Sequence, residues 1–259
     1  MTESAAAPAV HISIKAEEIF RLGSFPVTNS LLLSCIVLLF LGGLALIGRK
    51  RLRLIPNYFQ SVAELFLEGT LGLMDSILGE RRKSERYLPL VATIFLFVLF
   101  SNWFGLLPGV GSFVVHNAGL TVPLLRSPSA DLNFTLALAV VTVFAINILG
   151  VIAIGFMSHT SKYFNFKSPI AFFIGLIELV SEIAKLISFS FRLFGNVFAG
   201  EVLLTVIAFL APYFLPLPFM FMEVFVGFIQ AFIFSMLALV FVAIATVPHG
   251  EGHEAVRAH

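Results

Sequence analysis

Residues 170–210 read IAFFIGLIELVSEIAKLISFSFRLFGNVFAGEVLLTVIAFL, a largely apolar run of about 40 residues that contains no proline. Ser168 and Pro169 come directly before it, as an N-cap and a first helical residue would. At 1.5 Å per residue the run predicts roughly 60 Å of helix, twice the ~30 Å thickness of bilayer hydrocarbon. Either two spans meet at a turn near Gly195 and Asn196, or one very long helix lies strongly tilted in the membrane.

The composition of the whole chain is that of a membrane protein with several spans. Of its 259 residues, 59% are hydrophobic and only 12% are charged, and the mean hydropathy is +1.00. Soluble domains are about 25% charged, so soluble enzymes and disordered scaffolds are excluded. The single cysteine, Cys35, excludes a disulfide framework and a cysteine-based metal site. The net charge of +1 gives no indication of a nucleic-acid partner.

Other apolar runs flank the long one and predict further membrane spans. They are residues 31–47, 88–107, 132–156 and 219–247, and a turn from Pro212 to Pro218 joins the last run to the long one. Residues 108–128 are rich in proline and glycine and predict an external loop. The first 27 residues predict an external segment and residues 248–259 a hydrophilic tail. The start of the chain lacks the pattern of a cleaved signal peptide, so none is expected.

Residues 57–83 differ from the spans because their polar residues recur with a helical period. Gln60, Glu64 and Glu68 are spaced by four residues, and Asp75 continues their stripe. This pattern predicts an amphipathic helix that lies in the membrane interface. A helix that packs on a partner protein would show the same pattern.

The distribution of lysine and arginine predicts how the chain is oriented. Ten of these residues fall in the loops that we place inside and three fall outside, and positive charge favours the cytoplasmic side. The ten are Arg49, Lys50, Arg51, Arg53, Arg81, Arg82, Lys83, Arg86, Lys162 and Lys167, and the three are Lys15, Arg21 and Arg126. The N-terminus is therefore expected outside, and the C-terminus inside only if residues 170–210 form one helix.

Several ionisable or polar side chains interrupt the apolar runs, and such residues at membrane depth are functional hypotheses by default. The long run carries Glu178, Glu182, Lys185, Arg192 and Glu201, and the last run carries Glu223 and Gln230. At 100° per residue, Glu178, Lys185, Arg192 and Asn196 fall within about 60° of one another and form a polar stripe. Asp131 precedes the run at 132–156, where it is either a helix N-cap or a functional carboxylate.

Arg192 is the most informative of these residues because its guanidinium stays charged at every accessible pH. It is either a pathway or counter-ion residue, or one half of an ion pair with Glu182 or Glu201. Glu178 and Lys185 either belong to a pathway or reach the headgroups. Glu201 and Glu223 are expected at similar depth, where two close carboxyls would share and relay a proton.

The motif FRLFGN at 191–196, followed by AGE at 199–201, resembles the signature of subunit a (subunit 6) of F-type ATP synthases. Further similarity lies in FPVTN at 25–29, PSADLNFT at 128–135 and QAFIF at 230–234, so the resemblance covers almost the whole chain in order. It implies an all-α integral membrane protein with about five transmembrane helices and one interfacial amphipathic helix. It also implies that residues 168–247 form a long tilted hairpin against a ring of subunit c.

The resemblance further assigns roles to individual residues of a proton pathway. Arg192 would face the carboxylates of the ring, with Asn196 and Gln230 as polar residues near its depth. Glu201 would line the outer of two offset half-channels together with Glu223, which stands where many bacterial members carry histidine. Glu178 would lie at the exit of the inner half-channel, while Lys185, Glu182 and Asp131 are weaker candidates.

The function implied is proton translocation coupled to ring rotation and ATP synthesis, in a subunit that is not itself catalytic. No Gly-x-x-x-x-Gly-Lys-[Ser/Thr] motif occurs, so nucleotide chemistry is expected in partner chains. The implied partners are the subunit c ring, the subunit b peripheral stalk, other F1Fo subunits and the bilayer of a bacterial inner membrane. No cofactor, metal or nucleic acid is implied. The alternatives are a proton-coupled secondary transporter and an assembly scaffold whose charges only pair helices.

Overall fold

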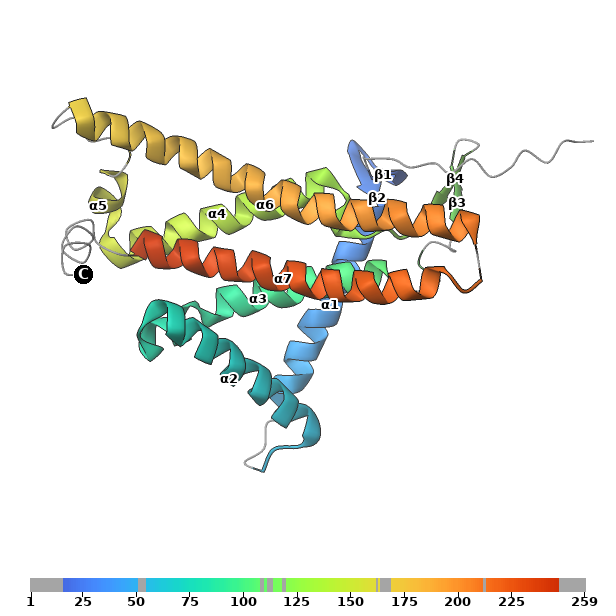
Figure 1. The fold of residues 1–259 in the computed structure, drawn as a ribbon, viewed down its shortest axis with the longest axis horizontal. Helices are drawn as coiled ribbons and strands as arrows, with labels where there is room; N and C mark the ends of the chain where they lie inside the picture. The colour runs from blue at the N-terminus through green and yellow to red at the C-terminus, as the bar shows by residue number, and fades with distance from the viewer. Residues whose placement is uncertain are drawn as a thin grey trace, which may run out of the picture.

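The computed structural model describes residues 16–50, 55–107, 110, 114–117, 120–161, 163, 169–211 and 213–246. Within these residues, five helices are long and apolar enough to cross a membrane. They are α1 (Asn29–Lys50), α3 (Arg81–Gly105), α4 (Leu132–Ile154), α6 (Pro169–Leu210) and α7 (Pro216–Thr246) (Figure 1). The prediction of an all-α integral membrane protein with about five spans is confirmed.

Some residues used in the sequence argument lie outside the described part of the chain. They are Lys15 and the rest of residues 1–15, Arg51, Arg53, Lys162, Lys167, Ser168, Pro212 and the tail at 248–259.

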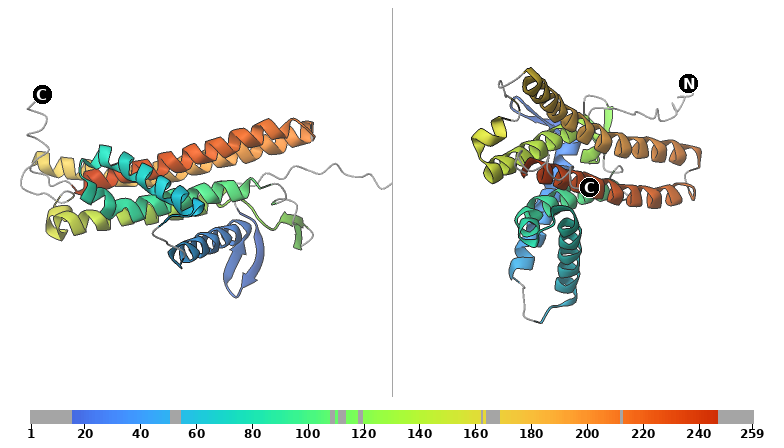
Figure 2. Two further views of the ribbon diagram at one scale, coloured as in Figure 1. Left: turned by 90° about the horizontal axis from the view of Figure 1, so that it is seen from below. Right: turned by 60° about the vertical axis from the view of Figure 1, so that its left-hand side comes forward.

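The helix α6 is continuous over 42 residues, so the alternative of two spans that meet near Gly195 and Asn196 is wrong. No proline follows Pro169 within it, and nothing else in the sequence removes a backbone hydrogen bond. After Ala211 the chain reverses and enters α7 at Pro216, where the fixed φ of proline suits a first helical position. The two long helices run back along each other as a hairpin in all the ribbon views (Figures 1 and 2).

The amphipathic segment forms α2 (Tyr58–Leu78), which is not among the helices apolar enough to span a membrane. It ends at Gly79, whose φ of 71° is a left-handed conformation that glycine adopts without strain. The predicted end at residue 83 differs for this reason: Arg81, Arg82 and Lys83 already belong to α3. The span predicted from residue 88 therefore begins seven residues earlier, and α3 continues through Pro89.

Short strands occupy the segments that the sequence predicted only as external loops. β1 (Glu18–Leu22) pairs with β2 (Phe25–Thr28) in an antiparallel hairpin that leads directly into α1. A second antiparallel hairpin, β3 (Val114–Asn117) with β4 (Leu120–Pro123), follows α3. The 3₁₀ turn η2 (Pro128–Ala130) then leads into α4, and the short α5 (Phe156–Thr160) follows α4.

The core lies where α3, α4, α6 and α7 meet. Val98, Ala139, Phe234 and Ala238 are fully buried there, and small residues such as the two alanines let helix backbones approach closely. Between α3 and α7, the Asn102 amide donates a 3.2 Å hydrogen bond to the backbone carbonyl of Gly227. Much of the apolar surface of α6 stays exposed, which suits a helix that faces lipid or another membrane subunit.

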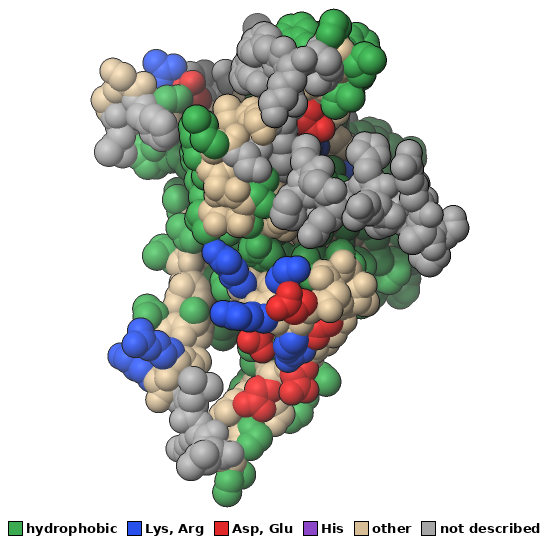
Figure 3. All heavy atoms as spheres, turned by 90° about the vertical axis from the view of Figure 1, so that its left-hand side faces the viewer, with side chains coloured by type: hydrophobic (Ala, Val, Ile, Leu, Met, Phe, Trp, Pro, Cys, Tyr) green, Lys and Arg blue, Asp and Glu red, His purple; other side chains and the backbone are tan. Residues whose placement is uncertain are grey.

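Charged side chains gather at one end of the molecule, where α2 ends and α3 begins (Figure 3). Arg81 pairs with Asp75 at 2.9 Å and with Glu85 at 3.4 Å, and Lys83 pairs with Glu80 at 3.3 Å. The first turns of α6 and the last turns of α4 and α7 lie at the same end (Figure 1). The membrane side that this end faces remains a prediction of the charge distribution.

Candidate functional site

A cavity of about 350 Å³ lies between α3, α6, α7 and the segment that follows β4. Its polar lining comes mainly from Asn102, Arg126, Glu201, Thr205 and Glu223. Glu201 and Glu223, two of the carboxylates predicted for a proton pathway, therefore line the same cavity. The sequence could not indicate that Arg126 joins them, because it stands in a proline- and glycine-rich loop 75 residues away from Glu201.

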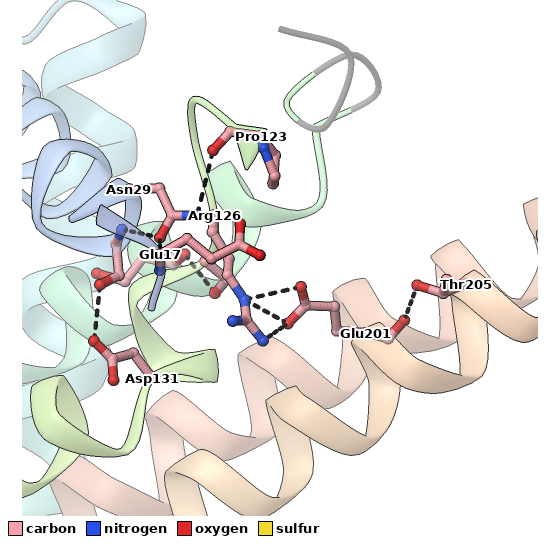
Figure 4. A network of polar contacts seen from close by, with 10 residues as sticks. Glu17, Asn29, Pro123, Arg126, Asp131, Glu201 and Thr205 are labelled. Atoms are coloured by element: carbon pink, nitrogen blue, oxygen red, sulfur yellow. Dashed lines mark hydrogen bonds and ion pairs between the residues drawn. The ribbon is translucent and has the colours of Figure 1, made fainter. Parts of the chain in front are cut away.

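Arg126 binds Glu201 in a bidentate ion pair. Its Nε lies 3.0 Å from Oε1 and its Nη2 lies 3.1 Å from Oε2 of Glu201. Arg126 is only 7% exposed, whereas the Glu201 side chain is 39% exposed. Figure 4 shows the guanidinium turned toward Glu201, with Asn29 and Asp131 on its opposite side.

Glu223 lies in the same cavity in a different environment. It is 7% exposed, and its carboxylate lies so close to Gly200 that a Cβ atom there would overlap it. Among the described residues, no side chain or backbone group hydrogen-bonds to the Glu223 carboxylate. A buried carboxyl without a protein partner requires water or a proton.

Arg192 lies near the middle of α6 with its side chain partly exposed. Its Nη2 donates a 3.0 Å hydrogen bond to Ser188 Oγ, and within the described part of the chain no carboxylate reaches it. The alternative that Arg192 pairs with Glu182 or Glu201 is wrong, because Lys185 holds Glu182 and Arg126 holds Glu201. Among the described residues, the positive charge of Arg192 is therefore not neutralised by a carboxylate.

One helical turn from Arg192, a polar contact joins the two long helices. The Asn196 amide on α6 donates a 2.6 Å hydrogen bond to Oε1 of Gln230 on α7, and Gln230 is only 2% exposed. The structure thus joins Asn196 to Gln230 one helical turn from Arg192, and the roles of these three residues stay a prediction.

A second polar cluster lies toward the start of α6. Glu182 accepts hydrogen bonds from Lys185, from Asn147 Nδ2 at 3.2 Å and from Tyr163 Oη at 3.2 Å. His159 Nε2 lies 3.0 Å from Asn147 Oδ1 and completes the cluster from α5. Burial raises the pKa of the Tyr163 hydroxyl, and the negative charge of Glu182 raises it further.

The sequence argument missed three members of this cluster, namely Asn147, His159 and Tyr163. Asn147 offered a signal, since an amide inside an apolar run is unusual, whereas His159 and Tyr163 stand in a short polar segment with no pattern of their own. Glu178 is half-buried one turn before Glu182 and acts electrostatically on Tyr163.

Asp131 caps the N-terminus of α4, as one of its two interpretations predicted. It accepts a 3.1 Å hydrogen bond from the backbone N–H of Asn133 and a 2.9 Å hydrogen bond from Ser30 Oγ on α1. It is 4% exposed and does not line the cavity. Across the described residues, no group of three or more His, Cys, Asp or Glu side chains is placed to hold a metal ion.

Five helices long and apolar enough to cross a membrane define this chain as a multi-pass integral membrane protein, with ionisable groups along the two longest of them. The family model described as "ATP synthase A chain" matches residues 30–243. Three relatives, each named "ATP synthase subunit a", agree. One from Moorella thermoacetica is 34% identical over 230 residues, or 89% of this chain and 96% of the relative.

The second relative, from Campylobacter jejuni subsp. jejuni strain 81-176, is 38% identical over 213 residues, which cover 81% of this chain and 85% of its own. The third, from Nitratiruptor sp., is 35% identical over 210 residues, covering 80% and 84%. The chain belongs to the ATP synthase A chain family.

Proposed function

We propose that this chain is the stator subunit of the membrane sector of an F-type ATP synthase and carries protons to and from a rotating ring of carboxylate-bearing subunits. The family match supports a role in the proton-translocating sector of that complex. The observation that carries the finer proposal is Arg192, a cation in the middle of a 42-residue helix with no carboxylate partner among the described residues.

The placement of Arg192 supports a barrier between two routes for protons. The cavity with Glu201 and Glu223 lies about 13 Å further along α6, at nine residues and 1.5 Å per residue. The cluster around Glu182 and Lys185 lies about 10 to 15 Å in the other direction, at seven to ten residues. We assign the cavity to the outer half-channel and the cluster, with Glu178, to the inner one.

Electrostatics explains why a fixed cation between two routes would couple proton flow to rotation. A carboxylate on the ring enters lipid only in its neutral form, since a bare charge there costs several kcal/mol or more. Opposite Arg192 the ionised form is favoured, so the proton must leave by one route and be replaced from the other. Each charge that falls through 100 mV supplies about 2.3 kcal/mol, so several protons must pass for each ATP.

Asn196 and Gln230 support the same centre by fixing the two long helices at the depth of Arg192. The chain itself would bind no nucleotide and would be non-catalytic, and subunit b and the other F1Fo subunits would hold it against the ring. The bacterial relatives favour a bacterial inner membrane. The transporter alternative gains no support, because α6 and α7 run unbroken through the depth where transporters interrupt their helices.

The decisive experiment replaces Arg192 in the assembled complex and measures ATP-driven proton pumping in inverted membrane vesicles. Arg192→Ala should abolish pumping and ATP synthesis while the subunit remains assembled. Arg192→Lys should also impair both, because a lysine lacks the planar fork and can lose its proton in an apolar site. Ser188→Ala, which removes only the hydrogen bond to Arg192, is the matched control and should retain pumping. Normal pumping by Arg192→Ala would leave only the scaffold alternative.

A further inference from the structure

We propose that Arg126 is a positioning residue that holds Glu201 as a fixed anion on the wall of the cavity, so that Glu223 alone takes up and releases the proton there. This proposal rests on the proposed function, because it divides the roles of two carboxylates within the same outer route. It replaces the expectation that Glu201 and Glu223 share a proton as an equivalent pair.

The ion pair has the geometry of a built site. Three contacts between 3.0 and 3.2 Å join the guanidinium of Arg126 to both oxygens of Glu201. Arg126 is buried to 93%, since only 7% of it is exposed, and a buried guanidinium requires a counter-charge that matches its planar fork. Arg126 therefore supplies the counter-charge of the Glu201 carboxylate and holds it in one orientation.

The segment that carries Arg126 is anchored on both sides, so the guanidinium is presented in one place. Before it, the Asn29 amide on α1 donates a 3.3 Å hydrogen bond to the backbone carbonyl of Pro123. After it, Ser127 packs against Gly105 of α3 so closely that no Cβ would fit there. Asp131 then ties the end of the segment to Ser30 on α1 at 2.9 Å.

Glu223 has none of these restraints. Among the residues that line the cavity, the charged or titratable ones are Arg126, Glu201 and Glu223, and only Glu223 lacks a partner within the described part of the chain. Its carboxylate fits against the backbone of Gly200, next to the residue that Arg126 holds. Because the Arg126–Glu201 pair carries no net charge, Glu223 is the carboxyl of the cavity that is left to take up a proton.

The proton steps balance without any further reactant. A hydronium ion from the outer water gives its proton to the Glu223 carboxylate and becomes water, and an O–H bond forms on Glu223. That bond then breaks as the proton passes to an ionised carboxylate of the ring, which leaves Glu223 charged for the next cycle.

The test measures passive proton flux through vesicles that carry the membrane sector stripped of its ATP-forming part, under a potassium diffusion potential, from pH 5.5 to 8.5. Arg126→Gln should lower the flux about tenfold and add a second ionisation to the pH profile, because Glu201 loses the cation that pairs with it. The double variant Arg126→Gln, Glu201→Gln should recover to about the flux of Glu201→Gln alone, with one ionisation. Arg126→Lys should rescue part of the flux.

Arg21→Gln removes one positive charge from an exposed pair with Glu18 in the β1–β2 hairpin and should leave the flux unchanged. Additive losses in the double variant, or an unaltered pH profile in Arg126→Gln, would overturn the proposal. If Arg126→Gln does not assemble, Arg126→Lys and the double variant still give the comparison. Loss of ATP-driven pumping by Arg192→Ala, measured in vesicles that keep the ATP-forming part, tests the proposed function separately from the outcome at Arg126.

Discussion

At the scale of single residues, the lack of a Cβ atom at Gly200 leaves room for the Glu223 carboxylate beside α6. The Glu223 carboxylate occupies the volume that a Cβ atom on residue 200 would fill. Glycine on α6 is therefore required by a side chain of α7, and the pair fixes the distance between the two long helices next to the cavity.

Gly200→Ala should displace the Glu223 carboxylate and slow passive proton flux by about tenfold, within the 1–3 kcal/mol that overpacking usually costs. The measurement is proton flux into vesicles that carry the assembled membrane sector. The matched control is Gly42→Ala on α1, where an added Cβ has nothing within 4 Å. Equal flux in both variants would contradict the packing of Glu223 against Gly200.

Also at this scale, the sequence marks Arg192 as a permanently charged side chain within an apolar run, but it does not reveal which residues surround it. An ion pair with Glu182 or Glu201 was an alternative because a charge at membrane depth needs a partner, but Glu182 lies ten residues, or about 15 Å, from Arg192 along α6. Lys185, at three residues from Glu182, is close enough to take that carboxylate. The ion pair between Arg126 and Glu201 could not be predicted, because contacts between residues 75 positions apart follow from the tertiary fold and not from local spacing.

At the scale of elements, the junction between α2 and α3 is held by Asp75. The nearby Ser84 hydroxyl and the Arg81 guanidinium, which donates a 2.9 Å hydrogen bond to Oδ2, lower the pKa of the Asp75 carboxyl below its usual value. Because the folded pKa is lower than the unfolded value of about 3.9, the stabilisation is complete above that pH and is lost as pH falls through the lowered pKa.

Hydrogen exchange at the junction should therefore be slow near pH 6, after correction for the intrinsic rate, and should accelerate as pH falls below about 4. Asp75→Asn should show faster corrected exchange at pH 6 and little change with pH. Glu68→Gln, an exposed carboxyl on the same helix, is the control and should behave as the unaltered chain does. A pH-dependent loss that persists in Asp75→Asn would assign the effect to another group.

The elements themselves were largely predictable, since apolar length and proline placement mark all five spans. Their boundaries were less so. The end of α2 depends on the backbone conformation of Gly79, and the continuity of α6 past Gly195 depends on packing against α4 and α7. The strands β1 to β4 lie in segments of mixed composition, where hairpin formation depends on pairing partners that periodicity does not reveal.

At the scale of the whole molecule, the unbroken α6 determines the relative placement of the ends of the other helices. Since α6 crosses once, the ends of α4 and α7 and the start of α3 share one side, and β3 lies on the other (Figure 1). Single cysteines at Lys83 and Met157, in a Cys35→Ser background, should react with an impermeant maleimide added from the inside. A cysteine at Val114 should react only from the outside.

The three positions are exposed, so access to reagent is limited by the membrane and not by burial. Labelling of positions 83 and 114 from the same side would contradict the orientation drawn from the basic loops. Labelling of 83 and 157 from opposite sides would contradict the single crossing of α6.

The length of α6 has a further consequence for the lipid around it. If its apolar residues from Ile170 to Leu210 stay within about 30 Å of hydrocarbon, an axis of about 60 Å must incline by roughly 60° from the bilayer normal. Most spanning helices incline by 0–40°. A thicker bilayer would bring the hairpin closer to the bilayer normal, and a thinner one would incline it further. The acyl-chain length of the lipid would therefore set the inclination of α6 and, with it, the orientation of Arg192.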